Sequence, residues 1–152
     1  MTEAVLSSSL REAVDEVLET MFFVESDGQA IQGRPPEELF TAQVDFEGSP
    51  PGILRMRISR AAAQQMAADF LGEESAELPA GRTVEVVLEL ANMICGAVLS
   101  RVESETTFRL SPPTASVEVG PIAELSAGAA GVCYFELPGG ALSVTLLEAA
   151  AA

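Results

Sequence analysis

Two side chains with useful chemistry stand three residues apart in a long, otherwise apolar stretch of the chain. Glu89 supplies a carboxylate and Asn92 a carboxamide, and Asn92 is the only asparagine among the 152 residues. A carboxamide both donates and accepts hydrogen bonds without adding charge, which suits it to orienting a small molecule such as water. The surrounding apolar residues recur at helical spacing and predict a long helix over 83–102. Residues three apart share one face of a helix, so we expect the two side chains to lie together.

The same face of this predicted helix holds further polar or small residues. At 100° per residue, Glu85, Asn92, Gly96, Ser100 and Glu103 fall within about 60° of Glu89. Glycine costs a helix about 1 kcal/mol relative to alanine, and it lacks a side chain where another backbone could approach. The residues alone leave two interpretations. This face is either the solvated side of a buried helix or a docking edge with a carboxylate, a carboxamide and a notch.

Composition limits the chemistry available to such a site. The chain has no His and no Lys, because all eight basic residues are Arg. Without His, a Ser-His-Asp or Cys-His nucleophile system is excluded, as are most catalytic zinc sites. Without Lys there is no P-loop lysine and no Schiff base. A metal-dependent hydrolase built on Glu85, Glu89 and Glu103 is disfavoured, because carboxylates on one helix make a poor cage. We therefore expect no metal ion and no cofactor bound by the chain itself.

Charge excludes several classes of partner. The 23 acidic residues against 8 basic ones give a net charge of −15, which excludes nucleic-acid backbone binding and disfavours anionic membrane surfaces. The first residues include acids where a signal peptide has basic ones, and no apolar run approaches the roughly 20 residues of a membrane span. Cys95 and Cys133 each lie inside an apolar run, so we expect two buried free thiols in a reducing compartment. These features predict a cytoplasmic protein.

A β-hairpin is predicted over residues 39–59. Apolar and polar residues alternate on both sides of a Gly-Ser-Pro-Pro-Gly turn at 48–52. The expected register pairs Phe46 with Leu54, Asp45 with Arg55 and Gln43 with Arg57. In this register the two arginines are cross-strand partners rather than an anion site.

The remaining patterns complete an α+β domain, with helices packed on a mostly antiparallel sheet. A first helix begins at a capping box made by Ser9 and Glu12. The other predicted elements are a strand over 21–24, a loop over 27–36, a helix over 59–71 capped by Ser59 and ended by Gly72, an acidic loop over 73–80, strands over 106–110, 114–119, 132–137 and 141–147, and a flexible connection over 127–131. No linker divides the chain, so we predict a single domain over 1–152 with a frayed tail over 149–152.

The segment Glu89-Leu90-Ala91-Asn92-Met93-Ile94-Cys95-Gly96, followed by Ser111-Pro112-Pro113, resembles the CheC/CheX/FliY family of chemotaxis response-regulator phosphatases. The family pattern is Asp or Ser, three residues, Glu, two residues, Asn, and a Pro about twenty residues later. The order of elements matches the CheX branch. This chain departs from the pattern with Glu85 at the first position. It also has Val17 and Thr20 where double-site members have a second Glu and Asn, which implies a single site.

This resemblance implies a substrate, a partner and roles for four residues. The substrate is the phospho-aspartate of a CheY-type response regulator, which brings its own Mg²⁺. Asn92 would orient the attacking water, Glu89 would pair with the lysine of the receiver's active site, and Glu85 and Gly96 would contact the partner. The resemblance also implies a homodimer, formed through an edge strand or a helix face. The alternative is a non-catalytic adaptor of a two-component or flagellar-switch pathway that uses the same helix face.

Overall fold

The computed structural model describes residues 3–22, 27–28, 34–48, 51–74, 78–101, 107–122 and 129–148. Its elements in chain order are α1 (Glu3–Phe22), β1 (Asp27–Gly28), β2 (Glu37–Glu47), β3 (Gly52–Ser59), α2 (Arg60–Leu71), α3 (Ala80–Leu99), β4 (Arg109–Leu110), β5 (Thr114–Gly120), β6 (Ala129–Leu137) and β7 (Gly140–Glu148).

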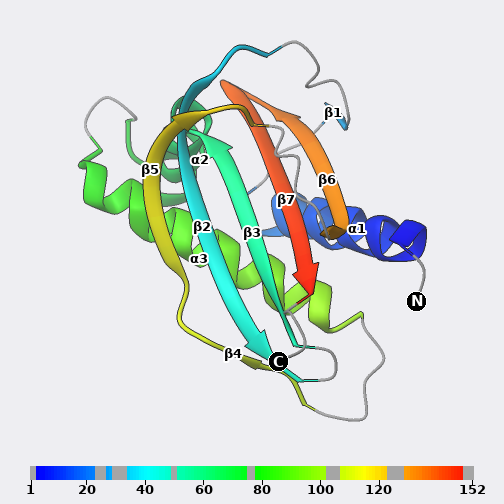
Figure 1. Ribbon diagram of the computed structural model, residues 1–152. Helices are drawn as coiled ribbons and strands as arrows, with labels where there is room; N and C mark the ends of the chain where they lie inside the picture. Colours follow the sequence, from blue (N-terminus) through cyan, green and yellow to red (C-terminus); the bar gives the residue numbers. More distant parts are fainter. Residues whose placement is uncertain are drawn as a thin grey trace.

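The strands form one antiparallel sheet in the order β1-β6-β7-β3-β2, and both β4 and β5 pair with the far side of β2. All three helices lie on one face of this sheet, as Figure 1 shows. The prediction of an α+β domain with helices on an antiparallel sheet is confirmed. Among the described residues, no helix is both long and apolar enough to cross a membrane.

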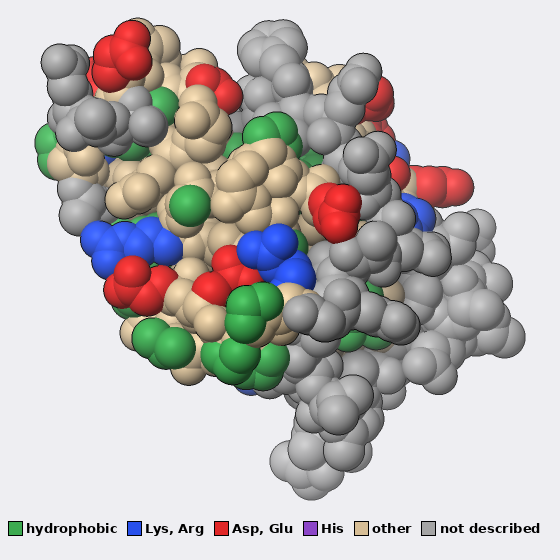
Figure 2. Space-filling view, turned by 90° about the horizontal axis from the view of Figure 1, so that it is seen from above, with side chains coloured by type: hydrophobic (Ala, Val, Ile, Leu, Met, Phe, Trp, Pro, Cys, Tyr) green, Lys and Arg blue, Asp and Glu red, His purple; other side chains and the backbone are tan. Residues whose placement is uncertain are grey.

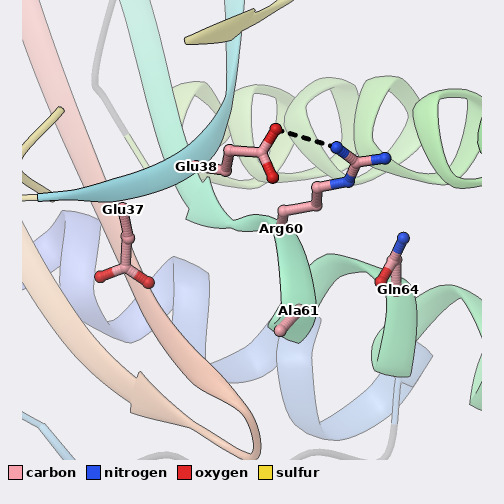
Figure 3. A pocket seen from close by; sticks show the side chains of 5 residues that line it. All are labelled: Glu37, Glu38, Arg60, Ala61 and Gln64. Carbon is pink, nitrogen blue, oxygen red and sulfur yellow. Dashed lines mark hydrogen bonds and ion pairs between the residues drawn. The ribbon is translucent and has the colours of Figure 1, made fainter. Parts of the chain in front are cut away.

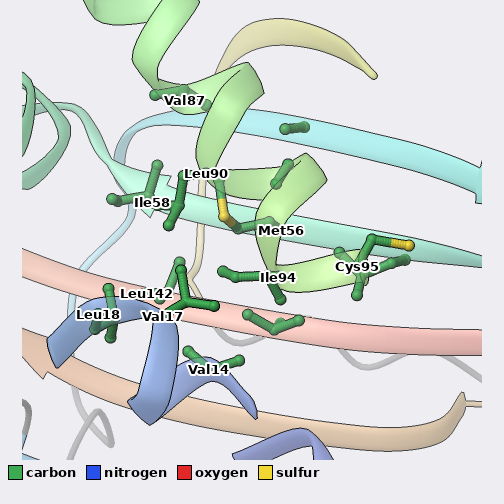
Figure 4. Packing of buried hydrophobic residues seen from close by; sticks show 14 of the residues in the cluster. Val14, Val17, Leu18, Met56, Ile58, Val87, Leu90, Ile94, Cys95 and Leu142 are labelled. Carbon is green, nitrogen blue, oxygen red and sulfur yellow. The ribbon is translucent and has the colours of Figure 1, made fainter. Parts of the chain in front are cut away.

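The hydrophobic core lies between the helices and the sheet. Alternate residues of the strands face the helices and are buried, as period-two alternation requires. Figure 4 shows this packing, in which α1 and α3 meet over β3 and β7. The labelled residues of this cluster are Val14, Val17, Leu18, Met56, Ile58, Val87, Leu90, Ile94, Cys95 and Leu142. The inner side of α3 is therefore packed into the core over most of the length of the helix.

The hairpin is confirmed as β2 and β3, but its predicted register is wrong by two residues. The observed pairs are Val44 with Leu54, Gln43 with Arg55, Thr41 with Arg57 and Phe46 with Gly52. The strand β3 begins directly opposite Phe46 because Gly52 has no side chain: a Cβ there would lie 2.6 Å from Cζ of Phe46 and 2.6 Å from the carbonyl oxygen of Leu147. A shift of two residues preserves the faces of a strand, so the buried residues are those expected.

The two arginines of the hairpin do find partners on the sheet. Arg55 donates to Oε1 of Gln43 at 3.4 Å, across the β2–β3 pair. Arg57 pairs with Glu118 of β5 at 3.2 Å, one strand further away, and donates to the carbonyl oxygen of Pro121 at 3.3 Å. The expectation of intramolecular partners is confirmed, but the partners differ from the predicted ones. Arg55, predicted opposite Asp45, bonds to Gln43, and Arg57, predicted opposite Gln43, pairs with Glu118.

The second helix is confirmed as α2, but Ser59 does not cap it through its side chain. Its hydroxyl instead donates to the carbonyl oxygen of Ala141 at 3.3 Å and accepts the N–H of Ala141 at 2.9 Å. Ser59 thereby joins the start of α2 to β7. Gly72 ends the helix as predicted, with a left-handed φ of 70°, a conformation in which glycine has no Cβ penalty.

Several predicted boundaries differ from the structure. The first helix begins at Glu3, so Ser9 lies inside it and the predicted capping box is wrong. Residues 21 and 22, predicted to begin a strand, are the last residues of α1. Within the predicted loop over 27–36, Asp27–Gly28 forms β1 and pairs with β6. The strand β6 begins at Ala129, within the predicted flexible connection. The long helix spans 80–99 rather than 83–102. Three of the four C-terminal strands are confirmed, and the one predicted over 106–110 is reduced to β4 among the described residues. The predicted tail over 149–152 lies outside the described residues.

Candidate functional site

The helix α3 is held by packing along one side. It contacts α1, α2 and the strands β2, β3 and β5. Its buried apolar residues are all at most 7 % exposed: Val86, Val87, Leu90, Ala91, Ile94, Cys95, Val98 and Leu99. A helix packed in this way presents its outer residues on a rigid support, which favours a site that depends on position.

The outer side of α3 carries the predicted residues in one row. Glu85, Glu89, Asn92, Gly96 and Ser100 are all exposed, and we call them the polar ridge. The structure therefore brings together the four predicted site residues on one face of one helix. Glu103, the other residue predicted on this face, lies outside the described residues.

Within the polar ridge, the two carboxylates differ in their partners. Oε2 of Glu85 lies 3.6 Å from Nη1 of Arg82, one helical turn earlier, and the two side chains are 69 % and 48 % exposed. Among the described residues, neither Glu89 nor Asn92 makes a side-chain hydrogen bond or an ion pair. As far as the described residues go, Glu89 and Asn92 thus offer a carboxylate and a carboxamide that are free to bind an outside partner.

Arg82 is a residue of this face that the sequence analysis missed. It is exposed, and it lies three positions before Glu85. Opposite charges at this spacing on a helix attract one another weakly, and this spacing was the signal that could have found it. Arg82 partly compensates the charge of Glu85. Glu89, beside Asn92, has no such ion pair with a described residue.

The C-terminal end of the ridge is fixed by hydrogen bonds. The hydroxyl of Ser100 donates to the carbonyl oxygen of Ala97 at 2.8 Å, so it supplies a hydrogen bond to a carbonyl group in the last turn of α3. Arg101 donates to the same carbonyl oxygen at 3.0 Å and forms an ion pair with Glu16 of α1. These contacts anchor the end of α3 rather than adding a reactive group.

The other parts of the family pattern lie elsewhere. Residues 111–113 connect β4 to β5, and the N–H of Ser111 donates to the carbonyl oxygen of Asp45 in β2 at 2.8 Å. In α1, Val17 is buried in the core, while the hydroxyl of Thr20 donates to the carbonyl oxygen of Glu16 at 2.6 Å. The aligned positions of α1 therefore hold one core residue and one hydroxyl that bonds to its own helix.

No alternative reactive centre emerges from the described residues. Within them, no group of three or more Cys, Asp or Glu side chains is placed to hold a metal ion. Cys95 and Cys133 are free and buried, as predicted. Burial raises the pKa of each thiol to about 12, so both stay protonated near neutral pH. Neither thiol is suited to act as a nucleophile.

A shallow hollow of about 400 Å³ lies where β2 meets α2, away from the polar ridge. Its lining residues are Glu37, Glu38, Arg60, Ala61 and Gln64 (Figure 3). The charged groups there are already paired: Arg60 lies 2.9 Å from Glu38, and Arg34 binds Glu37 through two hydrogen bonds. In the view from above, basic side chains likewise sit beside acidic ones (Figure 2). This hollow offers little uncompensated chemistry, so the polar ridge is the stronger candidate.

The comparisons with known proteins give the family and the fold. The family model described as chemotaxis phosphatase CheX matches residues 40–136. No curated protein matches the chain. Among solved structures, the chemotaxis protein CheX from Vibrio vulnificus is 18 % identical with a TM-score of 0.76, and the match covers 98 % of this chain and 99 % of that one.

Two further solved structures share the fold. CheX from Desulfovibrio desulfuricans is 19 % identical, with a TM-score of 0.72 and coverage of 95 % and 99 % of the two chains. The CheX–CheY–BeF3–Mg²⁺ complex from Borrelia burgdorferi matches with 18 % identity, a TM-score of 0.65 and coverage of 93 % and 96 %. Since the family model matches residues on both sides of the polar ridge and more than half of the chain, the protein belongs to the CheX family of chemotaxis phosphatases.

Proposed function

We propose that this chain is a cytoplasmic phosphatase that accelerates hydrolysis of the phospho-aspartate on a CheY-type response regulator. The observation that supports it most is the uncommitted pair Glu89 and Asn92, exposed on a helix that is otherwise packed into the core. The CheX of Borrelia burgdorferi was solved with CheY, BeF3 and Mg²⁺, which supports a receiver as the partner of this chain as well.

In this proposal Asn92 orients the attacking water. Phosphoryl transfer proceeds through a loose transition state, so most of the catalysis comes from placing the nucleophile in line. A carboxamide can accept a hydrogen bond from water and donate one to a phosphoryl oxygen. It does so without placing a second negative charge beside the phosphoryl group. The packed side of α3 keeps this carboxamide in place.

Glu89 docks the receiver by pairing with the lysine of its active site. A carboxylate is a poor base for water next to a phosphoryl group, because the two anions repel each other. Glu85 is a contact at the rim, and Arg82 already compensates its charge. The receiver supplies the phospho-aspartate, the lysine and the Mg²⁺, so the chain needs no metal or cofactor of its own.

The test is the decay rate of a Mg²⁺-loaded, phosphorylated CheY-type receiver, over a panel of receivers, with and without this protein. Asn92→Ala should lower the acceleration on the order of 100-fold, while the receiver still binds. Glu89→Ala should act mainly through weaker association. Matched controls are Gln65→Ala, which removes an exposed carboxamide from α2, and Glu19→Ala, which removes an exposed carboxylate from α1. Binding without acceleration would favour the adaptor function, and a fully active Asn92→Ala would exclude the assigned role.

We also propose that the chain forms a homodimer through β5. This strand pairs with β2 on one side only among the described residues, and it exposes Val117 by 53 % and Val119 by 72 %. An edge strand with exposed apolar side chains is a template for another strand. Val119→Lys should therefore yield a monomer in sedimentation experiments. Phe70→Lys adds the same charge at an exposed apolar position of α2, and dissociation by that variant instead would place the interface on a helix face.

A further inference from the structure

The polar ridge contains a glycine that the fold itself does not require. Gly96 has no left-handed backbone conformation, and its carbonyl oxygen accepts the N–H of Ser100 at 3.0 Å as in an ordinary helix. A Cβ added at Gly96 would meet nothing within 4 Å. An alanine would therefore fit without strain and would suit the helix better.

Several other glycines of the chain have visible structural reasons. A Cβ on Gly140 would lie 2.4 Å from Cβ of Ser59, and one on Gly52 would collide with Phe46. Gly72 and Gly139 adopt left-handed φ values of 70° and 87°. Gly96 and Gly81 have neither reason, although both lie in α3, where glycine is unfavourable. What distinguishes Gly96 from Gly81 is its position on the polar ridge beside Asn92.

Gly96 lies one helical turn after Asn92, on the same exposed face. A missing side chain lets another surface approach the helix backbone more closely, whereas helices with ordinary side chains at the contact stay 8–10 Å apart from their neighbours, axis to axis, as a rough guide. Asn is also a short side chain. To bring its carboxamide to a phosphoryl group inside a partner, the helix itself must come close.

We infer that Gly96 sets the distance of closest approach between α3 and the receiver, and that part of the receiver's main chain lies directly over it. This inference rests on the proposed function and deepens it. Gly96 is a positioning residue, because it acts by letting Asn92 and Glu89 reach the active site of the receiver. Any side chain at position 96 holds the partner away, and the loss grows with the size of that side chain.

The experiment measures two quantities for each variant: binding to a CheY-type receiver loaded with BeF3 and Mg²⁺, and the decay rate of the phosphorylated receiver. The variants are Gly96→Ala and Gly96→Leu. The matched controls are Gly81→Ala and Gly81→Leu, because Gly81 is also an exposed glycine of α3 with open space for a Cβ but lies fifteen residues earlier. Thermal unfolding shows that each variant is folded.

Gly96→Ala should raise the melting temperature by about 2–4 °C and yet weaken both binding and decay. Gly96→Leu should lower the acceleration on the order of 100-fold, while both Gly81 variants stay within about twofold of the unmodified protein. A gain in stability with a loss in binding is a result that a merely structural glycine cannot produce.

The outcomes separate this inference from the proposed function. If Gly96→Leu binds and acts like the unmodified protein, the inference about Gly96 is wrong and the phosphatase proposal stands. If the unmodified protein binds the receiver without accelerating decay, the phosphatase proposal is wrong and the binding series alone decides on Gly96. If no receiver of the panel binds, both are overturned.

Discussion

The two sides of α3 use the same helix for opposite purposes. On the inner side, residues such as Leu90 and Ile94 are almost fully buried and pack against α1 and the sheet. On the outer side, Glu89 and Asn92 make no side-chain hydrogen bond or ion pair with described residues. The inner side stabilises the fold, while the outer side contributes little to it.

This difference explains why one helix can supply a whole site. A chemical group that takes no part in packing can be chosen for its chemistry alone, and its position is still fixed by the packed side. The comparison predicts a separation of effects. Substitutions on the inner side of α3 should change stability, and those on its outer side should change activity with the receiver.

The largest effect is expected on the inner side. Ile94→Ala removes a fully buried side chain from the core and should lower the free energy of unfolding by about 2–5 kcal/mol. Asn92→Ala, two residues earlier, should change it by no more than about 0.5 kcal/mol. Urea denaturation of both variants measures this difference. A comparable loss for Asn92→Ala would mean that the polar ridge also stabilises the fold, which would break the comparison.

The thiol of Cys95 offers a second test of the inner side, together with Cys133 in β6. Burial raises the pKa of both thiols to about 12 in the folded protein, whereas an unfolded cysteine titrates near 8.5 as a rough value. The folded state therefore resists ionisation. Stability should be constant below about pH 8.5 and fall as the pH rises toward 12, by about 1.4 kcal/mol per pH unit per thiol.

Urea denaturation between pH 7.5 and 10 checks this slope. Cys95→Ala and Cys133→Ala should each halve the slope, whatever their effect on stability at neutral pH. A slope that is unchanged in both variants would assign the alkaline loss to other groups. Thiol labelling at pH 8 should be slow in the native protein and fast in urea.

The arrangement of α3 was predictable from sequence because helix geometry leaves little freedom. Once the apolar spacing indicates a helix, the angular positions of Glu89, Asn92 and Gly96 follow from 100° per residue. The strand faces were predictable for the same reason, since alternation has a fixed period of two. The spacing of Arg82 and Glu85 also indicated their contact. What the sequence could not supply was whether Glu89 and Asn92 have side-chain partners among the described residues.

The errors came from features that depend on contacts between distant segments. The register of β2 and β3 depends on how Gly52 fits against Phe46 and Leu147, which lies on β7. The hydroxyl of Ser59 has a local role available as a cap, but it bonds to Ala141, 82 residues away. Local patterns favour local partners, so tertiary alternatives of this kind stay hidden until the fold is known.

A smaller effect is expected from the ion pair that fastens the end of α3. Arg101 pairs with Glu16 of α1, and the two side chains are 29 % and 57 % exposed. Arg101→Ala should lower the free energy of unfolding by up to about 1 kcal/mol, and salt should reduce this loss. Arg82→Ala breaks a more exposed pair within α3 itself, and it should cost at most about 0.5 kcal/mol. If both variants lost the same free energy of unfolding, the pair between α1 and α3 would stabilise the fold no more than an ordinary surface ion pair does.

The smallest effect concerns Glu37, a carboxylate of β2. Two hydrogen bonds from Arg34, at 2.9 and 3.0 Å, hold the pKa of Glu37 below its usual value. A lowered pKa means that the folded state favours the ionised form. The stabilisation is therefore complete above the ordinary carboxyl pKa of about 4.3 and is lost as the pH falls through the lowered value.

Glu37→Gln should accordingly reduce stability at pH 7, and the difference from the unmodified protein should shrink as the pH falls below about 4. Glu89→Gln is the matched control, because this ridge carboxylate has no hydrogen bond to a described residue to lose. Urea denaturation of both variants between pH 3 and 7 makes the comparison. If Glu89→Gln lowered stability at pH 7 as much as Glu37→Gln, Glu89 would have a stabilising partner in the folded chain. The carboxylate would then be committed before any receiver arrives, and its docking role would lose its physical basis.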